Sequence, residues 1–382
     1  MAAREHHKVR QGMTRIVKCR SCGKESITIS SVLGLCADCL RTDFDRWFPE
    51  VMRVHEQARA QDGLPLSVAR SPDGVTCQIC GNNCQLGPGE AGYCGLRIAT
   101  GKRLEFVTGT ARRARVSWYH DALPTNCVAD WVCAGGSDCG YPQYSHSQGP
   151  EYGYYNLAVF YEACSFDCLF CQNWHYRGQS SHEHSADDVA RDVTDRVSCI
   201  CFFGGDPGPQ VIHALATARL ARSRRSGILR ICWETNGNLS ERYLGAIVKE
   251  SLESGGTIKI DLKAWSEPIS YALCGISNRR TLEVVGKLLK IASQRRDPPL
   301  VVISTLLVPG YIDESEVRSI AEFIASLDPD TPYSLLGFAP NFLMADLPCT
   351  SLDHAERCLE QATSAGLKRV HIGNRHLLGK DY

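Results

Sequence analysis

Three closely spaced cysteines in the middle of the chain are the residues best placed to do chemistry. Cys164, Cys168 and Cys171 have C-x3-C-x2-C spacing and directly follow the apolar stretch 156–160. A loop of this kind can bring three thiolates onto three corners of one [4Fe–4S] cube. A cluster that only carries electrons usually has four protein ligands, so three ligands predict an open iron at which a substrate or cofactor binds. The alternatives are a chance grouping or a zinc site without its fourth ligand.

Cysteine is abundant in the rest of the chain as well, with twenty among 382 residues. In a reducing compartment such a number indicates metal binding rather than disulfides. Two C-x2-C pairs near the N-terminus are separated by thirteen residues, and four thiolates so arranged predict a closed, structural zinc site. Its ligands would be Cys19, Cys22, Cys36 and Cys39.

A second group of four cysteines lies within eighteen residues that are rich in glycine. Zinc and a second iron–sulfur cluster both fit this group, which consists of Cys77, Cys80, Cys84 and Cys94. A looser third set could complete another cluster, line a cofactor pocket or bridge to the second group; it consists of Cys127, Cys133 and Cys139. Cys199, Cys201 and Cys232 lie in apolar strand-like runs, where a free cysteine usually behaves as a small buried hydrophobe.

Strand and helix patterns alternate from about residue 154 onward. Strand-like runs occur at 155–162, 198–203, 228–233, 257–262, 300–308 and 332–338, with amphipathic stretches at 185–196, 209–225, 240–254, 281–293 and 313–326 and a final helix at 352–365. Repeated βα units predict a parallel sheet with helical crossovers. About six units are too few for a closed eightfold barrel. We therefore expect an α/β fold with a partial (β/α)6 barrel at 151–382, preceded by a zinc-ribbon-like domain and helix at 1–60 and a cysteine-rich metal- or cofactor-binding region at 61–150.

The loops that follow successive strands carry unusual residues. In such a barrel the chemistry lies at the carboxyl ends of the strands, and paired glycines let the backbone approach a ligand closely. These loops contain Gly204, Gly205, Asp206 and Pro207, then Glu234, Thr235, Asn236 and Gly237, then Asp261 and Lys263, and finally a Leu-Val-Pro-Gly turn at 307–310. Each loop alone is a weak signal, but four in consecutive units, together with the cysteine loop, predict one shared site.

From about residue 70 to its end, the chain resembles the radical S-adenosylmethionine (SAM) enzymes grouped with pyruvate formate-lyase activating enzyme. Within that group it is most similar to the AmmeMemoRadiSam type. The motifs that carry this resemblance are the second cysteine group, the cluster loop with Phe170 before its last cysteine and Asn173 after it, and the segments 340–346 and 366–374.

The resemblance implies a [4Fe–4S] cluster on Cys164, Cys168 and Cys171, with SAM bound at its open iron. It assigns the SAM amino group to segment 204–207, where Asp206 replaces the family's Glu, and the SAM carboxylate or ribose to Asp261 and Lys263. Residues 234–237 would lie beside the methionyl group and the ribose. A reduced cluster would cleave SAM to a 5′-deoxyadenosyl radical, using electrons from a low-potential donor. One departure is that segment 336–339 lacks the histidine that contacts SAM in glycyl-radical activases.

Several reactions share this core. The overall layout is similar to methanogen radical SAM proteins that modify methyl-coenzyme M reductase, in particular the cobalamin-dependent enzymes that C-methylate one of its glutamines. This implies C-methylation of a protein or peptide, although the usual Asp-x-His-x-x-Gly cobalamin motif is absent. A corrinoid would then bind through a Tyr or His of residues 112–155, whose aromatics could equally be packing residues. A glycyl-radical-enzyme activase is the alternative.

Composition excludes other classes of function. A formal net charge of zero provides no general attraction for nucleic acid or an anionic membrane. A zinc-ribbon scaffold or nucleic-acid-binding protein with a vestigial cluster is therefore disfavoured, despite the local basic patch of Arg112, Arg113 and Arg115. No apolar run is long enough to span a membrane, and the first eight residues lack a hydrophobic signal core. We expect a cytoplasmic protein.

Overall fold

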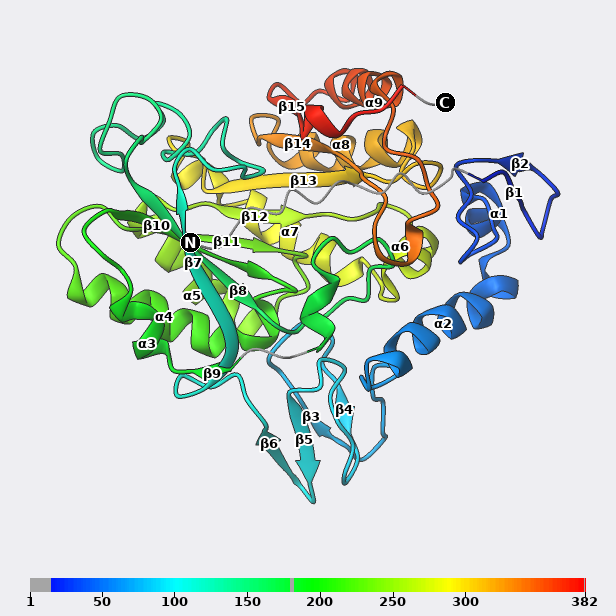
Figure 1. Cartoon of the computed structure of the whole chain (residues 1–382), viewed down its shortest axis with the longest axis horizontal. Coiled ribbons are helices and arrows are strands. Elements are labelled where there is room, and N and C mark those ends of the chain that lie inside the picture. The colour runs from blue at the N-terminus through cyan, green and yellow to red at the C-terminus, as the bar shows by residue number, and fades with distance from the viewer. Residues whose placement is uncertain (1–14, 179–181, 381) are drawn as a thin grey trace, which may run out of the picture.

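A computed structural model describes residues 15–178, 182–380 and 382 (Figure 1). The first eight residues, on which the expectation about a signal sequence rests, lie outside the described residues. Within the described part, no helix is long and apolar enough to cross a membrane.

One curved sheet forms the centre of the molecule. Its nine strands follow the order β15-β14-β13-β12-β11-β10-β8-β7-β9. The seven strands from β8 to β15 in this order are parallel, whereas β7 and β9 are antiparallel to their neighbours. Their bounds are β7 Ala114–Ala122, β8 Tyr155–Tyr161, β9 Glu183–His184, β10 Val197–Gly204, β11 Arg230–Thr235, β12 Ile258–Asp261, β13 Val301–Leu307, β14 Tyr333–Gly337 and β15 Val370–Gly373.

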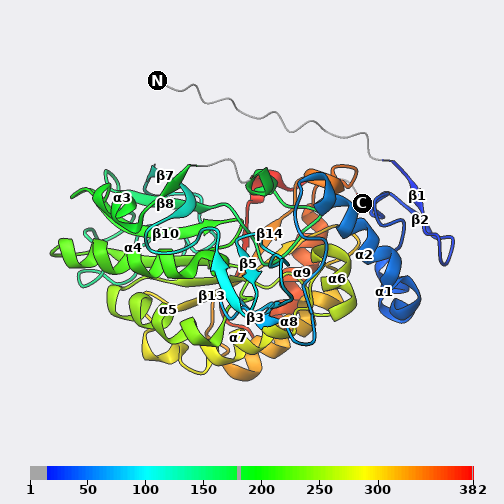
Figure 2. The ribbon, with the colours of Figure 1, turned by 90° about the horizontal axis from the view of Figure 1, so that it is seen from below.

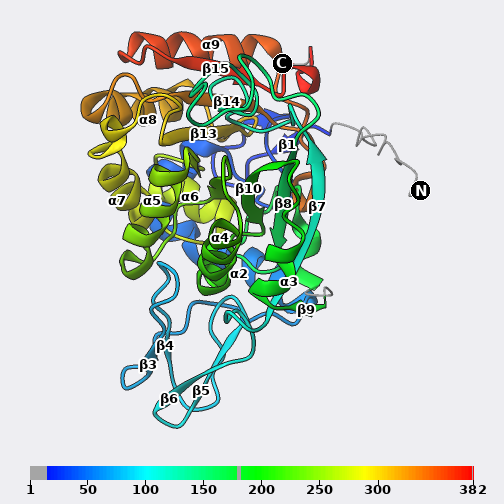
Figure 3. The same ribbon diagram turned by 90° about the vertical axis from the view of Figure 1, so that its left-hand side faces the viewer.

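Helices cover one face of this sheet (Figures 2 and 3). They are α3 Ala186–Arg191, α4 Val211–Arg224, α5 Glu241–Ser254, α6 Glu267–Cys274, α7 Arg279–Leu289, α8 Glu314–Leu327 and α9 Leu352–Ser364. The strands between them are almost wholly buried, as the apolar runs of the sequence predict; all seven residues of β13 are buried. The parallel sheet with helical crossovers is therefore confirmed, and one further parallel strand, β15, follows the six predicted βα units.

The region before the barrel is not a separate layer. Strand β7 comes from the cysteine-rich segment but pairs with β8 over seven residues, from Val116 with Tyr161 to Ala122 with Tyr155. The insertion 123–153 then links β7 to β8. Two short hairpins precede β7 and project from the sheet in Figure 1: β3 Val75–Thr76 with β4 Gln85–Leu86, and β5 Arg97–Thr100 with β6 Arg103–Phe106.

The N-terminal elements pack against the side of the barrel at which the parallel strands have their carboxyl ends. They are the hairpin β1 Val17–Lys18 and β2 Glu25–Ser26, and the helices α1 Ala37–Thr42 and α2 Phe44–Gln61. The Tyr311 hydroxyl donates to the Leu35 carbonyl (3.0 Å), and Arg41 pairs with Asp313 (2.8 Å) and Glu316 (3.3 Å). Buried side chains of these elements and of the barrel form one continuous core.

Candidate active site

A cavity of about 400 Å³ lies at the carboxyl ends of the parallel strands. Most of the site residues predicted from the sequence line it: Cys164, Cys168, Phe170, Cys171, Asn173, Gly204, Gly205, Glu234, Thr235, Asn236, Asp261 and Lys263. They come from the ends of β8, β10, β11 and β12, so parallel pairing gathers loops that are far apart in sequence. Asp206 and Pro207 do not line the cavity.

The cysteine loop after β8 places three sulfur atoms at this cavity. The backbone N–H of Phe166 donates to the Cys164 sulfur (3.3 Å), as does the amide of Asn236 (3.5 Å). No three sulfur atoms of the loop lie within 4.8 Å of one another. The ligands of a [4Fe–4S] cluster bind different irons, so a cluster does not need its sulfur ligands as close together as a single ion does. Burial raises the pKa of Cys171 to about 12, so ligation has to displace its proton.

Buried charges hold the cysteine loop in place. Asp167, between two of the cysteines, is fully buried and accepts from His55 Nδ1 (2.9 Å), Arg59 (3.3 Å) and Arg177. Although burial acts to raise the pKa of Asp167, the hydrogen bond from His55 and the positive charges of Arg177 and Arg59 help to lower it to about 2. His55 and Arg59 belong to α2, so the N-terminal helix directly braces the cluster loop.

The backbone of the glycine loop after β10 passes so close to the end of β8 that it leaves no room for a Cβ. Gly204 has a φ of +119°, and a Cβ on Gly205 would lie 2.4 Å from the Ala163 carbonyl oxygen. The Asp206 carboxylate turns into the protein and accepts from the Thr235 hydroxyl (2.8 Å), the Asn236 N–H (2.8 Å) and the Gly208 N–H (2.7 Å). It therefore ties the glycine loop to the turn after β11. Its predicted contact with a cofactor stays a prediction.

Two further ion pairs belong to the predicted residues. Lys263 pairs with Asp261 and lies 5.6 Å from the centre of the Phe170 ring. Glu234 pairs with Lys259 of β12 at 3.1 Å. Lys259 is buried, and the sequence reasoning did not single it out.

The sequence predicted only part of the far wall of the cavity. It is formed by the insertion, through Asn126, Cys127, Val128 and Asp130, and by the end of β15, through residues 371–375. Trp131 anchors the insertion, because its ring stacks on His371 (5.0 Å between ring centres) and its Nε1 donates to Ser334 Oγ (3.0 Å). Two sequence signals pointed to this wall: the motif at 366–374, and the third cysteine set, for which lining a cofactor pocket was one of the alternatives.

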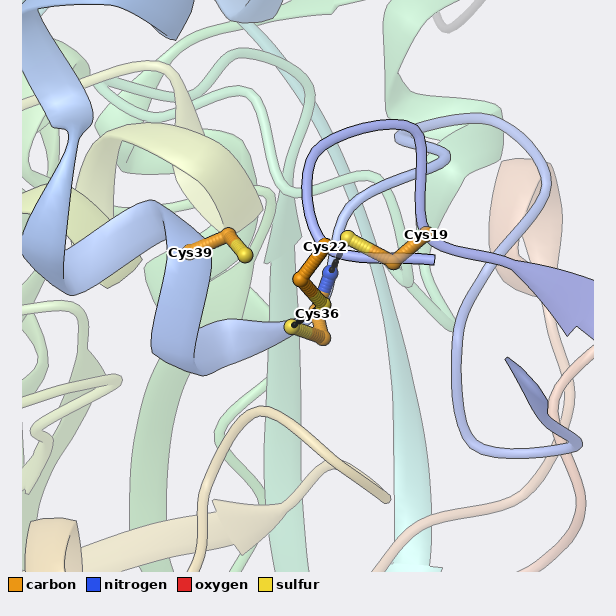
Figure 4. A group of neighbouring side chains, drawn as sticks. All are labelled: Cys19, Cys22, Cys36 and Cys39. Atoms are coloured by element: carbon orange, nitrogen blue, oxygen red, sulfur yellow. Dashed lines mark hydrogen bonds between the residues drawn. The ribbon is translucent and has the colours of Figure 1, made fainter. Parts of the chain in front are cut away.

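The four N-terminal cysteines form a second, separate site (Figure 4). Their sulfur atoms all lie within 4.8 Å of one another. Tetrahedral Zn–S bonds of about 2.3 Å place neighbouring sulfurs about 3.8 Å apart, and the Cys22 and Cys36 sulfurs lie 3.8 Å apart. The Cys36 N–H donates to the Cys19 sulfur (3.4 Å). Although burial acts to raise it, backbone N–H groups lower the pKa of Cys19 to about 6. The geometry fits one metal ion, and zinc stays a prediction for it.

The second cysteine group packs beside the cluster loop. Asn82, within this group, donates to the Ser165 carbonyl (2.8 Å) and accepts from Asn238 (2.7 Å). No three of the four sulfur atoms of Cys77, Cys80, Cys84 and Cys94 lie within 4.8 Å of one another. Zinc and a second cluster both remain predictions for this group.

Comparison with known proteins finds a family model that matches this part of the chain. A sequence model of the Radical SAM superfamily matches residues 158–324, from β8 to α8, which include the cluster loop, the glycine loop and the ends of β11 and β12. The chain carries a radical SAM domain. This confirms the barrel that the sequence predicts and the general family resemblance.

Two relatives match this chain over different lengths. An uncharacterized protein of Methanocaldococcus jannaschii is 23% identical over 312 residues, which cover 78% of this chain and 81% of that protein. The pyruvate formate-lyase 1-activating enzyme of Escherichia coli K12 is 28% identical over 174 residues, which cover 43% of this chain and 66% of that enzyme.

Two solved structures match part of the chain, each with a TM-score below 0.5. Streptococcus suis SuiB bound to precursor peptide SuiA matches with a TM-score of 0.43 and 15% identity, over 56% of this chain and 47% of SuiB. A domain of pyruvate-formate lyase-activating enzyme from Bacteroides vulgatus matches with a TM-score of 0.35 and 21% identity, over 46% of this chain and 98% of that domain. The chain therefore spans about half the length of SuiB.

Proposed function

We propose that this chain is a radical SAM enzyme that abstracts a hydrogen atom from a carbon of a protein or peptide. The observation that carries the proposal is the meeting of three cluster cysteines with the glycine, Glu-Thr-Asn and Asp-x-Lys loops around one cavity. The chain's similarity to an enzyme that activates pyruvate formate-lyase, itself a protein, supports a protein substrate.

The residues present fit the cofactors. Cys164, Cys168 and Cys171 would hold a [4Fe–4S] cluster, and Asn236 would donate a hydrogen bond to one of its thiolates. The backbone carbonyls of residues 204–205 and the charged pair Asp261–Lys263 would bind and orient SAM. When bound, the cluster and SAM together supply a carbon-centred radical able to break an unactivated C–H bond.

The protein's own task is to orient the ligands and exclude water. Phe170, Leu306 and Leu336 give the cavity apolar surface, and the insertion covers the side opposite the cluster loop. Such enclosure protects a reactive intermediate from side reactions. Hydrogen abstraction needs no acid–base pair, which agrees with the absence of a hydrolytic constellation among the residues that line this cavity.

Two finer reactions follow from the same core. An activase would stop after removing one hydrogen atom, and the relative from Escherichia coli supports this reading. Cobalamin-dependent C-methylation, with a glutamine of methyl-coenzyme M reductase as target, rests on the sequence layout alone. A cavity of about 400 Å³ is near the lower end of the range for pockets that hold one drug-sized ligand, roughly 300–1,000 Å³. Such a cavity offers little room for a corrinoid beside SAM, and for this reason we favour the activase.

The test of the core function is anaerobic reconstitution followed by reduction in the presence of SAM. We expect the native protein to release 5′-deoxyadenosine and the Cys164→Ala/Cys168→Ala/Cys171→Ala variant to release none, because it lacks all three thiolates. Cys358→Ala, a buried cysteine of α9 away from the cavity, is the matched control. Product formation by the triple variant would refute the assignment.

Extraction of the bound cofactors separates the two finer reactions. If the protein takes up cobalamin during expression, or binds it with SAM and a substrate peptide present, methylation is supported and the activase reading fails. If it binds no cobalamin under either condition, the methyltransferase reading fails.

A further inference from the structure

Five cysteines outside the cluster loop, the N-terminal site and the second cysteine group line a second cavity inside the curved sheet. This cavity has a volume of about 140 Å³ and adjoins the active cavity, because Asn126, Cys127, Phe203 and Glu234 line both. The five cysteines are Cys127 and Cys133 from the insertion, Cys199 and Cys201 from β10, and Cys232 from β11.

Strand register explains why the three sheet cysteines face the same space. Cys199 and Cys201 are two residues apart on β10, so their side chains point to the same face of the sheet. Cys201 pairs directly with Cys232 on the neighbouring parallel strand. Cys127 and Cys133 reach the cavity from the opposite side, on a segment more than sixty residues earlier in the chain. The sequence predicted Cys199, Cys201 and Cys232 only as small buried hydrophobes, and it did not predict that they converge on one cavity.

The five thiols surround the cavity rather than meet at one point. Burial raises the pKa of Cys133 to about 12, and the neighbouring Cys127 and Cys232 thiols add to the rise. Burial also raises the pKa values of Cys199 and Cys201. The Cys232 and Cys133 thiols add to the rise at Cys199, and the Cys127 and Cys232 thiols add to the rise at Cys201. No three of the five sulfur atoms lie within 4.8 Å of one another. A single ion therefore does not fit them.

A buried ammonium group stands at the edge of this ring. Lys259 Nζ lies 3.1 Å from the Cys127 sulfur, 3.1 Å from the Cys201 sulfur and 3.1 Å from Glu234 Oε2. A neutral thiol is a weak acceptor for a buried cation, whereas a thiolate is a strong one, and the thiolate is the form that binds metal. Arg230, also lining the cavity, is held by Glu151 (2.5 Å).

We propose that this inner cavity is an iron–sulfur cluster site, with Cys127, Cys133, Cys201 and Cys232 as its thiolate ligands. An all-cysteine set is the usual ligand set for such clusters, and the cavity is several times larger than the about 30 Å³ that one water occupies in the liquid. On binding, each S–H proton is released and replaced by a bond from sulfur to iron. The Lys259 ammonium then offsets thiolate charge at two of the ligands.

Iron and sulfide analysis tests this site. After anaerobic reconstitution with ferrous iron and sulfide, we expect the Cys201→Ser/Cys232→Ser variant to hold roughly two to four fewer iron atoms per chain than the native protein, with a matching loss of sulfide. Cys358→Ser, at a buried position of α9 away from this cavity, should match the native protein. Equal iron and sulfide in the double variant and the native protein would overturn the proposal.

A second variant guards against misfolding of the first. Cys133→Ser removes one ligand from the insertion and leaves the sheet intact; with native circular dichroism and less iron it supports the site, and with native iron it refutes it. The proposal does not rest on the proposed function. The Cys164→Ala/Cys168→Ala/Cys171→Ala variant should lose SAM cleavage yet keep the iron that Cys201→Ser/Cys232→Ser removes, so the two failures are distinguishable.

Discussion

At the residue scale, Asp206 shows how a motif position can serve the protein rather than a ligand directly. The resemblance places it at the SAM amino group, but its carboxylate is buried and faces Thr235, Asn236 and Gly208. Burial raises its pKa to about 6. Its three donors come from two neighbouring loops of the cavity, so this single side chain fixes the distance between them.

We predict that Asp206→Asn lowers the free energy of unfolding by about 2 kcal/mol and weakens SAM binding about tenfold. An amide has one acceptor oxygen in place of two, so at least one of the buried donors loses its partner, which costs about 1–3 kcal/mol. Chemical denaturation and equilibrium binding of SAM measure the two effects. Asp187→Asn, at a partly exposed position of α3, is the control. Native stability and SAM affinity in Asp206→Asn would show that the carboxylate is not the link between these loops.

At the scale of elements, the N-terminal helices are part of the support of the cluster loop. Helix α2 supplies His55 and Arg59 to Asp167, and Asp346 accepts from Ser30 Oγ (3.0 Å) and from the Ser31 N–H (2.6 Å). The segment that carries Asp346 also reaches the cluster loop, since the Leu343 N–H donates to the Leu169 carbonyl (3.0 Å). Because the four N-terminal cysteines shape the start of these helices, a metal there stabilises contacts far from its own ligands.

We predict that Cys22→Ser/Cys39→Ser loses about one zinc per chain and has a lower melting temperature. Binding energy at a four-thiolate site is folding energy, and its loss releases the chain that leads into α1 and α2. Metal analysis and thermal unfolding measure both changes. Lys18→Ala, an exposed position on the same hairpin, is the control and should change neither. Unchanged zinc in the double variant would rule out the zinc site.

At the scale of the whole molecule, the insertion 123–153 spans the concave side of the open sheet. It leaves the sheet at β7, contacts β14 and β15 through Trp131, and returns to β8. The Val128 carbonyl accepts from Ser334 Oγ (2.8 Å), and the Gly140 N–H donates to Asp297 (2.7 Å). The loop between β7 and β8 thus reaches β14 and β15 at the other end of a sheet that does not close, and it also lines the active cavity.

We predict that Trp131→Ala lowers the free energy of unfolding by about 2 kcal/mol and exposes the insertion to protease. The substitution removes the stacking on His371 and the hydrogen bond to Ser334; full truncation of a buried aromatic costs about 3–5 kcal/mol, and Trp131 is half-buried. Denaturation and limited proteolysis with mapping of the cut sites measure the outcome. Tyr152→Ala, 75% exposed in the same insertion, is the control. If both variants resist protease equally, the Trp131 contacts do not hold the insertion.

The sequence by itself determined the local features of this protein. Apolar runs such as 300–308 predicted buried strands because a parallel strand is covered on both faces, and spacing alone identified the cysteines of the cluster loop and of the N-terminal group. Only the tertiary structure decided which distant residues meet. Strand β7 was not predicted from the sequence. Its pairing partner β8 lies more than thirty residues away, and the run Trp118-Tyr119-His120 lacks the apolar pattern of a buried strand. The convergence of five cysteines on the inner cavity was not predicted for the same reason. Cys127, Cys133, Cys199, Cys201 and Cys232 come from three separate segments, and only strand register and the path of the insertion bring them together.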